Sequence, residues 1–386
     1  MRIGIDANPM VGDMGGVGWH CYHLLRTMLA KQEGIDVVAY AKPGAERPEA
    51  VGSWPGVERL QWVNSSRWGM GKQGSSDQLD LYHGTNFRMQ TVGRYGGVVT
   101  IHDLWLDRHP EYSKKMLGQW PSSFKTRQTA LRARKTITVS EFSARELVEL
   151  YGLKREHIRV IPNGVSEDFV PRLDEPAMAE LRKRIGLKAA RYVLFIGGAD
   201  PRKNHQTFLE AAEKVRKKLG ARMLVLIGSP IHPFGDYEKT ARRRSLQEKV
   251  LCPGRLSTND LQLLYSFADL FVFPSLYEGF GMPVLEAMAC GAPVLTSNST
   301  ALAEVGGDAA MLADPQDAKA LGEAMIRVLE DEPLRAALRV KGFERAKQFS
   351  WEQVAAKTIE LYREVCGEST AEELKVFKLG PGLSTF

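Results

Sequence analysis

Long apolar runs are missing from this sequence. The apolar strings at 192–196 and 270–273 are far shorter than the roughly 20 residues that a membrane-spanning helix requires. The opening residues, Met-Arg-Ile-Gly-Ile-Asp, have the pattern of a strand, and no long apolar leader follows them. We therefore expect a cytoplasmic protein that is soluble or bound peripherally at the inner face of the membrane.

Cysteine is scarce, and its spacing excludes the common cysteine-based frameworks. The four cysteines lie far apart in a chain of 386 residues, which is typical neither of a metal site nor of a disulfide scaffold. His20 and His23 share one face of an expected helix, but no carboxylate or thiolate stands in register with them. An Asp-x-Asp motif is also absent. We expect no metal ion and no cofactor.

Two nucleotide-binding motifs are missing as well. The glycine string at 15–18 lies between the first expected strand and helix and could offer amides to a phosphate, but no Gly-Lys-Ser or Gly-Lys-Thr follows it. The string also lacks the spacing of the dinucleotide fingerprint, which argues against an NAD-dependent oxidoreductase. Taken alone, a glycine turn of this kind is weak support for a ligand site.

What the chain does contain is a regular alternation of patterns. Short β-branched runs alternate with longer helical patterns throughout, which is typical of parallel sheets covered by helices. The length of 386 residues exceeds what one hydrophobic core usually supports. The sequence therefore predicts an α/β protein with two doubly wound, Rossmann-like domains that face a central cleft. Its net charge of +6 suits an anionic small ligand, a membrane surface or nucleic acid without choosing among them.

The expected domain boundaries follow from one stretch with little regular pattern. Residues 165–187 are charged and contain two prolines, so we place the linker between the domains there. The first domain is expected over 1–170 and the second over 171–350. The remaining segment, 351–386, is expected to form a helix that returns to the first domain and a frayed tail.

One strand, turn and helix pattern in the second half places a ligand edge. The strand at 270–273 ends at Pro274, a turn with two glycines follows, and Pro283 lies in the first turn of a helix that Gly291 closes. Ligands of open parallel sheets bind beyond the carboxyl ends of the strands. Backbone amides at the glycines and at the helix start would favour a phosphate or a polarised hydroxyl there.

Two acids flank that turn. Glu278 precedes it, and Glu286 lies about one turn into the helix, where its carboxylate could accept hydrogen bonds from vicinal hydroxyls such as those of a ribose. The same acids are also explained as a solvated loop residue and as a first-turn acid that stabilises the helix dipole. The pair alone does not decide between these interpretations.

The complete string is more specific than the two acids. Residues 274–294 read Pro-Ser-Leu-Tyr-Glu-Gly-Phe-Gly-Met-Pro-Val-Leu-Glu-Ala-Met-Ala-Cys-Gly-Ala-Pro-Val. This string closely resembles the signature of the family 4 retaining glycosyltransferases, which have the two-domain GT-B architecture. The resemblance covers nearly the entire chain. Its further strings are at 15–18, 83, 100–105, 139–143, 162–164, 200–204, 254–257, 303–307 and 349–352.

The resemblance assigns most of the donor site to the second domain. Glu278 would contact hydroxyls of the transferred sugar, and Glu286 would hold the ribose. Lys203 falls where the family lysine contacts the donor phosphates, and a cation there stabilises the charge that develops on a departing diphosphate. Many relatives carry an arginine where this chain has Gly198, so Arg202 is expected to supply a second cation. The implied donor-binding set is Glu286, Arg202, Gly279, Phe280, Gly281, Met282, Gly16 and Gly198.

The first domain would hold the acceptor. His102 follows an apolar run and, taken alone, is explained more readily as a structural residue. The resemblance places it beside the reacting sugar, where it orients a hydroxyl; the departing phosphate takes the acceptor proton in the front-face reaction of the family. His102, Glu278 and Lys203 form the implied catalytic set. Gly15, Asp103 and Trp105 are expected on the acceptor side.

The strings at 100–105 and 200–204 are most similar to those of bacterial mannosyltransferases of polysaccharide and O-antigen assembly. We therefore expect transfer of mannose from GDP-mannose to a saccharide or polyprenyl-linked saccharide, with no nucleic acid as a partner. No residue that reads the nucleobase can be assigned, so a UDP-hexose donor stays open. A nucleotide-sugar epimerase of the same architecture and a catalytically idle binding protein also stay open.

A basic segment bears on where the acceptor lies. Residues 111–135 carry seven lysines and arginines, interleaved with apolar and aromatic side chains. Such a segment suits an anionic membrane surface, and a solvated basic face explains it equally well. Contact with a membrane is accordingly an expectation that depends on a lipid-linked acceptor.

Overall fold

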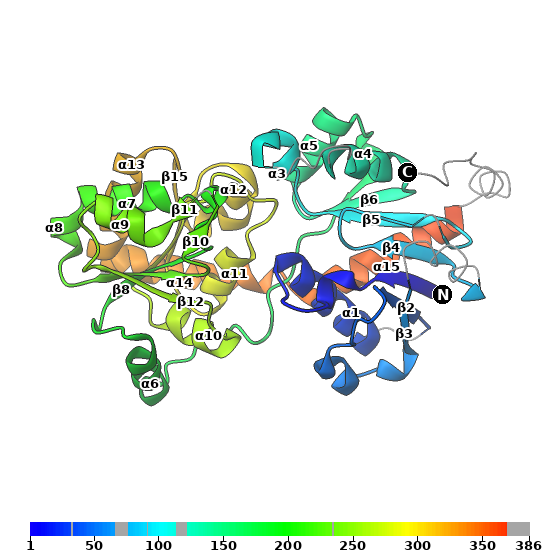
Figure 1. The fold of residues 1–386 in the computed structure, drawn as a ribbon, viewed down its shortest axis with the longest axis horizontal. Coiled ribbons are helices and arrows are strands. Elements are labelled where there is room, and N and C mark those ends of the chain that lie inside the picture. Colours follow the sequence, from blue (N-terminus) through cyan, green and yellow to red (C-terminus); the bar gives the residue numbers. More distant parts are fainter. Residues whose placement is uncertain (32–33, 66–75, 91, 113–121, 234, 369–386) are drawn as a thin grey trace. The chain divides into compact units, whose positions relative to one another are not determined.

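The chain forms two compact units. The computed structural model describes residues 1–31, 34–65, 76–90, 92–112, 122–233 and 235–368. Met1–Gly164 together with the chain from Trp351 onward forms the first unit, and Val165–Ser350 forms the second. Each unit has its own parallel sheet with helices packed on it (Figure 1).

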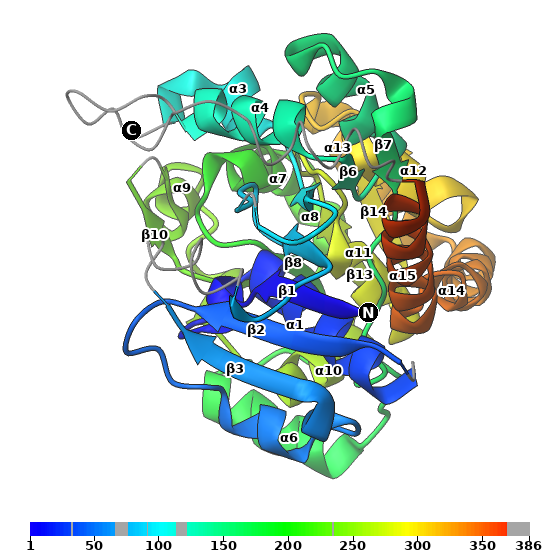
Figure 2. The ribbon, with the colours of Figure 1, turned by 90° about the vertical axis from the view of Figure 1, so that its right-hand side faces the viewer.

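The first unit is built on a seven-stranded sheet in the order β3-β2-β1-β4-β5-β6-β7. All neighbouring strands pair in parallel, and Figure 2 shows β1, β2 and β3 side by side. The central strands are buried on both faces, which explains why they read as continuous apolar runs. The strands are β1 (Arg2–Asp6), β2 (Asp36–Ala41), β3 (Leu60–Asn64), β4 (Leu81–Gly84), β5 (Gly97–Ile101), β6 (Lys135–Thr138) and β7 (Ile158–Val160).

The helices of the first unit begin and end where their local sequence provides caps. Ser140 precedes one of them and accepts a hydrogen bond from the amide of Ser143, and Gly152 ends it with a φ of 70°. The described helices are α1 (Gly16–Lys31), α3 (Trp105–Arg108), α4 (Ser122–Arg132), α5 (Glu141–Tyr151) and α15 (Trp351–Glu368).

Helix α15 completes the first unit although it follows the second unit in sequence. Its Tyr362 is fully buried, and the hydroxyl lies 2.6 Å from Nδ1 of His83 on β4. The other ring nitrogen of His83 pairs with the hydroxyl of Thr100 on β5 at 2.7 Å. His83, one of the residues that resemble the family pattern, therefore joins α15 to the sheet and has no ring nitrogen left for a substrate.

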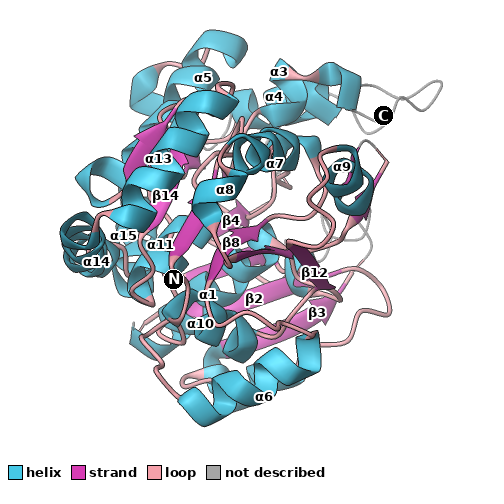
Figure 3. Cartoon of the chain, turned by 90° about the vertical axis from the view of Figure 1, so that its left-hand side faces the viewer, coloured by secondary structure: helices cyan, strands magenta, loops and turns pink. Residues whose placement is uncertain are grey.

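The second unit is built on a six-stranded parallel sheet in the order β12-β9-β8-β13-β14-β15. Figure 3 shows its strands enclosed by helices. The strands are β8 (Tyr192–Ile196), β9 (Met223–Ile227), β12 (Val250–Gly254), β13 (Leu270–Phe273), β14 (Val294–Ser297) and β15 (Met311–Ala313), with a small hairpin of β10 (Ile231–His232) and β11 (Gly235–Asp236). The helices are α6 (Glu175–Ile185), α7 (His205–Lys214), α8 (Arg216–Leu219), α9 (Tyr237–Arg243), α10 (Thr258–Ser266), α11 (Met282–Ala289), α12 (Thr300–Gly306), α13 (Ala318–Glu330) and α14 (Glu332–Lys347).

The segment that we expected to be a linker belongs to the second unit. The unit begins at Val165 and not at 171, because the amide of Val165 donates to the carbonyl of Phe349 at 3.0 Å and its backbone pairs with Ser350. Further along, α6 packs on α10, and Gln262 of α10 donates a hydrogen bond to the carbonyl of Val170. The charges and prolines of 165–187 therefore mark a half-exposed edge of the unit.

Candidate active site

The strand order of the second unit changes direction between β8 and β13. From β8 the chain proceeds outward through β9 and β12, and it then returns to start β13, β14 and β15 on the other side. The loops that leave the carboxyl ends of two such strands diverge and leave room for a ligand. The loop after β8 contains Lys203, and the loop after β13 contains Glu278. The fold thus brings together two segments that are far apart in sequence.

Lys203 and Glu278 form an ion pair at this edge. Nζ of Lys203 lies 2.6 Å from Oε1 of Glu278, and the two side chains are 15% and 10% exposed. Burial lowers the pKa of the Lys203 ammonium, and the neighbouring carboxylate opposes that shift. Burial also acts to raise the pKa of Glu278, but the charges of Lys203 and Arg202 outweigh it, so the net direction is downward. The pair therefore places a charged ammonium and a charged carboxylate side by side.

The turn before Lys203 is held by its own side chains. Asp200 accepts a hydrogen bond from the amide of Arg202 at 2.9 Å and starts a short 3-10 helix, Pro201–Lys203. Asn204 follows in the left-handed conformation, and its Nδ2 donates to the carbonyls of Pro274 and Pro315 at 3.0 and 2.7 Å. Asn204 thereby ties the loop after β8 to the loop after β13.

Glycines in both loops are required by close packing. Gly197 has a φ of 155°, and a Cβ there would lie 2.7 Å from Cγ of Lys203. Gly198 has a φ of 67°, which disfavours the arginine that many relatives carry at this position. Gly281 has a φ of 107°, and a Cβ on it would lie 2.5 Å from the side chain of Leu302. Because these glycines have no side chain, the backbone amides at the two turns can approach a ligand closely.

Helix α11 begins directly after this glycine turn. Gly281 is its N-cap residue, Met282 is its first residue, and a proline follows. The ring of Phe280 is buried and lies 5.9 Å from the ring of Phe349, so its side chain belongs to the core and only its backbone is offered to a ligand. The helix start has amides without intrahelical partners, which favours an anion.

Glu286 lies one turn into α11 and is paired with Tyr265 of α10. The hydroxyl of Tyr265 lies 3.1 Å from Oε2 of Glu286. Burial raises the pKa of the Glu286 carboxyl from its ordinary 4.5 to about 7, and the tyrosine hydrogen bond opposes the shift in part. A carboxyl with this pKa is only partly ionised near neutral pH. Ligand hydroxyls, which donate hydrogen bonds, favour its charged form.

In the first unit, His102 is held at the end of β5. Its Nε2 donates a hydrogen bond to the carbonyl of Thr85 at 2.9 Å, and its ring meets those of His20 and Phe87 edge to face at 4.7 and 5.7 Å. Burial lowers the pKa of His102, and the Thr85 carbonyl and Asp103 oppose the shift. The ring is therefore neutral near pH 7 and, with Nε2 committed, presents Nδ1 as an acceptor.

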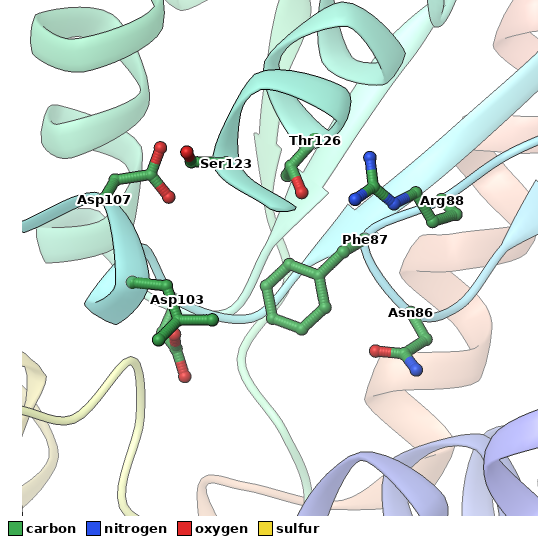
Figure 4. A pocket seen from close by; sticks show the side chains of 8 residues that line it. Asn86, Phe87, Arg88, Asp103, Asp107, Ser123 and Thr126 are labelled. Atoms are coloured by element: carbon green, nitrogen blue, oxygen red, sulfur yellow. The ribbon is translucent and has the colours of Figure 1, made fainter. Parts of the chain in front are cut away.

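A cavity of about 260 Å³ opens beside His102, between the loops after β4 and β5 and helix α4. Figure 4 shows the ring of Phe87 in the middle of its lining, with the carboxylates of Asp103 and Asp107 on one side and Arg88 on the other. Its lining is thus rich in hydrogen-bonding groups around one aromatic face.

Comparison with known proteins shows to which family this chain belongs. The model described as Glycosyltransferase Family 4 matches residues 14–169, and the model described as Glycosyl transferases group 1 matches 178–345. O-antigen chain mannosyltransferase B of Escherichia coli is 35% identical over 286 residues, which cover 73% of this chain and 74% of that protein. The chain belongs to the family 4 glycosyltransferases.

Solved structures agree on the architecture of this glycosyltransferase. Sucrose-phosphate synthase from Thermosynechococcus elongatus superimposes with a TM-score of 0.75 and 21% identity, covering 95% of this chain and 100% of that chain. Anabaena HepE in complex with UDP and glucose superimposes with a TM-score of 0.73 and 18% identity, covering 94% and 100%. These similarities, with the two parallel sheets, confirm the predicted GT-B fold.

The glycine string of the glycosyltransferase differs from the turn that we expected. Helix α1 begins at Gly16, so Gly16 lies in the first helical turn, and Gly15 precedes it and accepts a hydrogen bond from the amide of Trp19. A Cβ on Gly18 would lie 2.5 Å from the carbonyl oxygen of Pro9. Packing against the chain at Pro9 therefore explains at least this glycine without a ligand.

The remaining acceptor-side predictions separate in the structure. Asp103 accepts a hydrogen bond from the amide of Trp105 at 3.1 Å and lines the cavity beside His102. The ring of Trp105 instead lies against His109 and Tyr112, with centroid distances of 3.9 and 5.3 Å. Trp105 is thereby committed to packing at the start of α3.

Sequence reasoning missed several residues that shape these sites. The sequence did not single out Tyr265, and only the packing of α10 on α11 reveals its contact with Glu286. His20, which we considered only as a metal ligand, pairs with Asn163 at 2.7 Å and packs on His102. The string at 162–164 therefore has a structural role that its sequence did not indicate.

Metal-binding clusters and membrane-spanning helices are both absent from the described residues. Within the described ranges, no group of three or more histidine, cysteine, aspartate or glutamate side chains is arranged to hold a metal ion. In the same part of the chain, no helix combines the length and apolar character that crossing a bilayer would demand. Part of the basic segment, 113–121, lies outside the described residues.

Proposed function

We propose that this glycosyltransferase moves mannose from GDP-mannose to a saccharide or lipid-linked saccharide acceptor with retention of the anomeric configuration. The observation that carries the proposal is the joint placement of Lys203, Glu278 and Glu286 at the carboxyl edge of the second sheet, where the strand order changes direction. A cation, a sugar-binding acid and a ribose-binding acid are the groups that a nucleotide-sugar donor needs.

The proposed roles are those that the family resemblance implies, and the geometry is compatible with them. Glu286 accepts hydrogen bonds from the ribose hydroxyls, and the start of α11 and the ammonium of Lys203 face the diphosphate. The ammonium has three donors, so Lys203 can keep Glu278 and also contact phosphate oxygens. Arg202 supplies the second cation. Glu278, held in place by Lys203, binds hydroxyls of the transferred sugar.

The proposed chemistry keeps the new bond on the face of the old one. The bond between the anomeric carbon and the diphosphate oxygen breaks, the acceptor oxygen bonds to the same face of that carbon, and the acceptor proton passes to the departing diphosphate. Neutral His102 orients a hydroxyl by offering Nδ1 as an acceptor. The cations stabilise the charge that develops on the diphosphate, so we propose that transfer requires no metal ion.

Incubation of the purified protein with GDP-mannose and a mannoside acceptor tests this function. We expect an α-linked product from the α-linked donor, identified by the one-bond C1–H1 NMR coupling of the new linkage. The rate should be unchanged in the presence of EDTA. A β-linked product, loss of the rate with EDTA, or free sugar and nucleotide as the only products would contradict the proposal.

A UDP-hexose is the second candidate donor. HepE, which shares the fold, was solved with UDP and glucose, whereas the relative that shares 35% identity is a mannosyltransferase by name. We favour GDP-mannose because the second similarity is the stronger one. Parallel reactions with GDP-mannose, UDP-glucose and UDP-galactose decide the matter, since preference for either UDP-sugar would replace the mannose assignment.

We further propose peripheral contact of the first unit with an anionic membrane. The support is helix α4, where Phe124 and Leu131 are 40% and 46% exposed beside basic side chains. Co-sedimentation with vesicles that contain phosphatidylglycerol should fall when Lys125, Arg127 and Arg132 are changed to glutamine. The matched control is Lys319→Gln on α13, in the second unit. Equal sedimentation of all variants would dispose of the membrane contact.

A further inference from the structure

The cavity beside His102 has a backbone that is fixed before any ligand arrives. Phe87 lies in the left-handed region with a φ of 57°, and its amide donates to the carbonyl of Thr100 on β5 at 3.0 Å. A Cβ on Gly84 would lie 1.8 Å from the carbonyl oxygen of Arg88, so the loop doubles back tightly on the end of β4. A non-glycine residue in this conformation is uncommon, and it is tolerated where the surroundings determine the backbone.

Phe87 connects the cavity to His102. One part of its ring lines the cavity, and the ring also meets the imidazole of His102 at a centroid distance of 5.7 Å. A molecule that covers this ring inside the cavity therefore lies about one side chain away from His102. The cavity is consequently placed to hold the part of an acceptor that adjoins the reacting hydroxyl.

The lining selects for a ligand with many hydroxyls. Two carboxylates, a guanidinium, an amide and the hydroxyl of Ser123 surround the ring of Phe87, as Figure 4 shows. Carboxylates and amides hydrogen-bond to paired hydroxyls, and an aromatic face covers the apolar C–H side of a sugar ring. The volume of about 260 Å³ is below the roughly 300–1,000 Å³ of sites for drug-sized ligands and suits one sugar ring.

The charges of the lining select against an anion. Asp103 and Asp107 contribute two carboxylates, and Arg88 contributes one cation. Burial raises the pKa of Asp107, the Tyr151 hydroxyl opposes that shift, and the neighbouring acids Asp103 and Glu146 add to it. A position where negative charge is already unfavourable is a poor place for a phosphate or a uronate.

We propose that this cavity is the acceptor subsite and that it binds one uncharged hexose unit, with Phe87 beneath the sugar ring and Asp103 and Asp107 on its hydroxyls. The inference rests on the proposed glycosyl transfer and adds to it the class of acceptor: a neutral saccharide end and not a phosphorylated one. Asp107 and Phe87 are thereby specificity-determining residues that the sequence did not reveal.

Binding of a matched pair of ligands tests the subsite directly. The probes are methyl α-D-mannopyranoside and its 6-phosphate, added to the protein in the presence of GDP, and saturation-transfer NMR reports their binding. We expect binding of the neutral mannoside, at least tenfold weaker binding of the phosphate, and loss of mannoside binding in Ser123→Phe, where the new ring fills the cavity. Asp107→Asn should narrow the difference between the two probes.

Two controls make the result decisive. Asp36→Asn removes an exposed carboxylate of the same unit, at the start of β2, and should bind both probes as the wild type does. Equal binding of the two probes by the wild type would overturn the subsite. Mannoside binding that is unchanged both in a folded Ser123→Phe protein and in Asp107→Asn would overturn it as well. Calorimetry with GDP-mannose separates the two proposals, because failure to bind the donor counts against the proposed function and not against the cavity.

Discussion

The hydroxyl of Tyr265 lies 3.1 Å from Oε2 of Glu286, a half-buried residue of the same unit. Tyr265 is fully buried, and its ring lies 5.2 Å from Phe271 and 6.0 Å from Phe169. Packing against these two rings therefore fixes the orientation of Tyr265 independently of its contact with Glu286. The contact holds one carboxylate oxygen of Glu286 in place, which suits the ribose-binding role proposed for this acid.

Tyr265→Phe should weaken donor binding while leaving the fold intact. The lost hydrogen bond corresponds to about 0.5–1.5 kcal/mol, or roughly two- to tenfold in the donor Kd. We expect a higher KM for the donor and little change in kcat. Calorimetric titration with GDP-mannose measures the change in the donor Kd.

Tyr237→Phe is the matched control for that variant. Tyr237 is also fully buried in the second unit, and its hydroxyl has no hydrogen-bond partner among the described residues. Its removal should leave the donor Kd unchanged. If both tyrosine variants changed the Kd equally, the contact with Glu286 would have no special role.

Donor affinity should depend on pH through Glu286. Burial raises the pKa of this carboxyl to about 7, so the free protein is largely protonated at pH 6 and largely ionised at pH 8. In the proposed donor site, ribose hydroxyls donate hydrogen bonds to the ionised carboxylate of Glu286 and stabilise it. Affinity should therefore rise as the pH passes through about 7, and binding near that pH should release a proton.

Calorimetry in two buffers of different ionisation enthalpy measures this proton release. Glu286→Gln should abolish both the release and the pH dependence. Cys290, a neighbouring thiol, has a pKa raised to about 12 by burial and does not titrate in this range. Uptake of a proton on binding would contradict the assignment of Glu286 to the ribose.

Removal of one partner from the Lys203–Glu278 ion pair should affect stability and activity together. Lys203→Met leaves the buried carboxylate of Glu278 without its ion-pair partner, which costs about 3–5 kcal/mol of folding free energy. Loss of a cation that faces the leaving group typically lowers kcat by about 10²–10³. Urea unfolding and steady-state kinetics measure the two effects separately.

The double variant Lys203→Met with Glu278→Gln separates structure from chemistry. It removes both charges, so stability should largely return while activity does not. Lys341→Met is the control, because Lys341 pairs with Asp308 at 2.9 Å on an exposed surface. Recovery of activity in the double variant would show that the pair only supports the fold.

Asn204→Ala should destabilise the second unit. The change removes two hydrogen bonds to buried carbonyls and places alanine at a φ of 62°, with an expected loss of about 2–4 kcal/mol. Asn204→Gly removes the same hydrogen bonds without the conformational strain and should lose about 1 kcal/mol less. Equal losses in urea unfolding would mean that the backbone strain contributes nothing.

Local patterns predicted most of the fold. The buried strand β13, its glycine turn and helix α11 follow each other within 20 residues, and each has an unambiguous signal. The strands β3 and β15 are harder to predict, because they are short, half-exposed edge strands without a continuous apolar run. The helical pattern that follows Asn204 is interrupted at Val215, which separates α7 from α8.

The site was predictable only where one string carried it. Glu278 and Glu286 belong to such a string, whereas Tyr265 and the lining of the cavity beside His102 are brought in by tertiary packing. Asp107 lies in a four-residue helix whose sequence gives no sign of a cavity. Long-range contacts of this kind leave no periodic trace in a single sequence.

The parallel bridge between Val165 and Ser350 has a consequence for dissecting the enzyme. The chain enters the second unit at Val165 and leaves it at Ser350, and these two residues pair through their backbones. Residues 165–350 form one continuous insertion between the two segments of the first unit. Residues 165–350 can therefore be expressed as one piece whose two ends already lie together, and binding of GDP-mannose, the proposed donor, can be tested on it in isolation. The first unit, in contrast, needs a short joining loop between Gly164 and Trp351 to become a continuous chain.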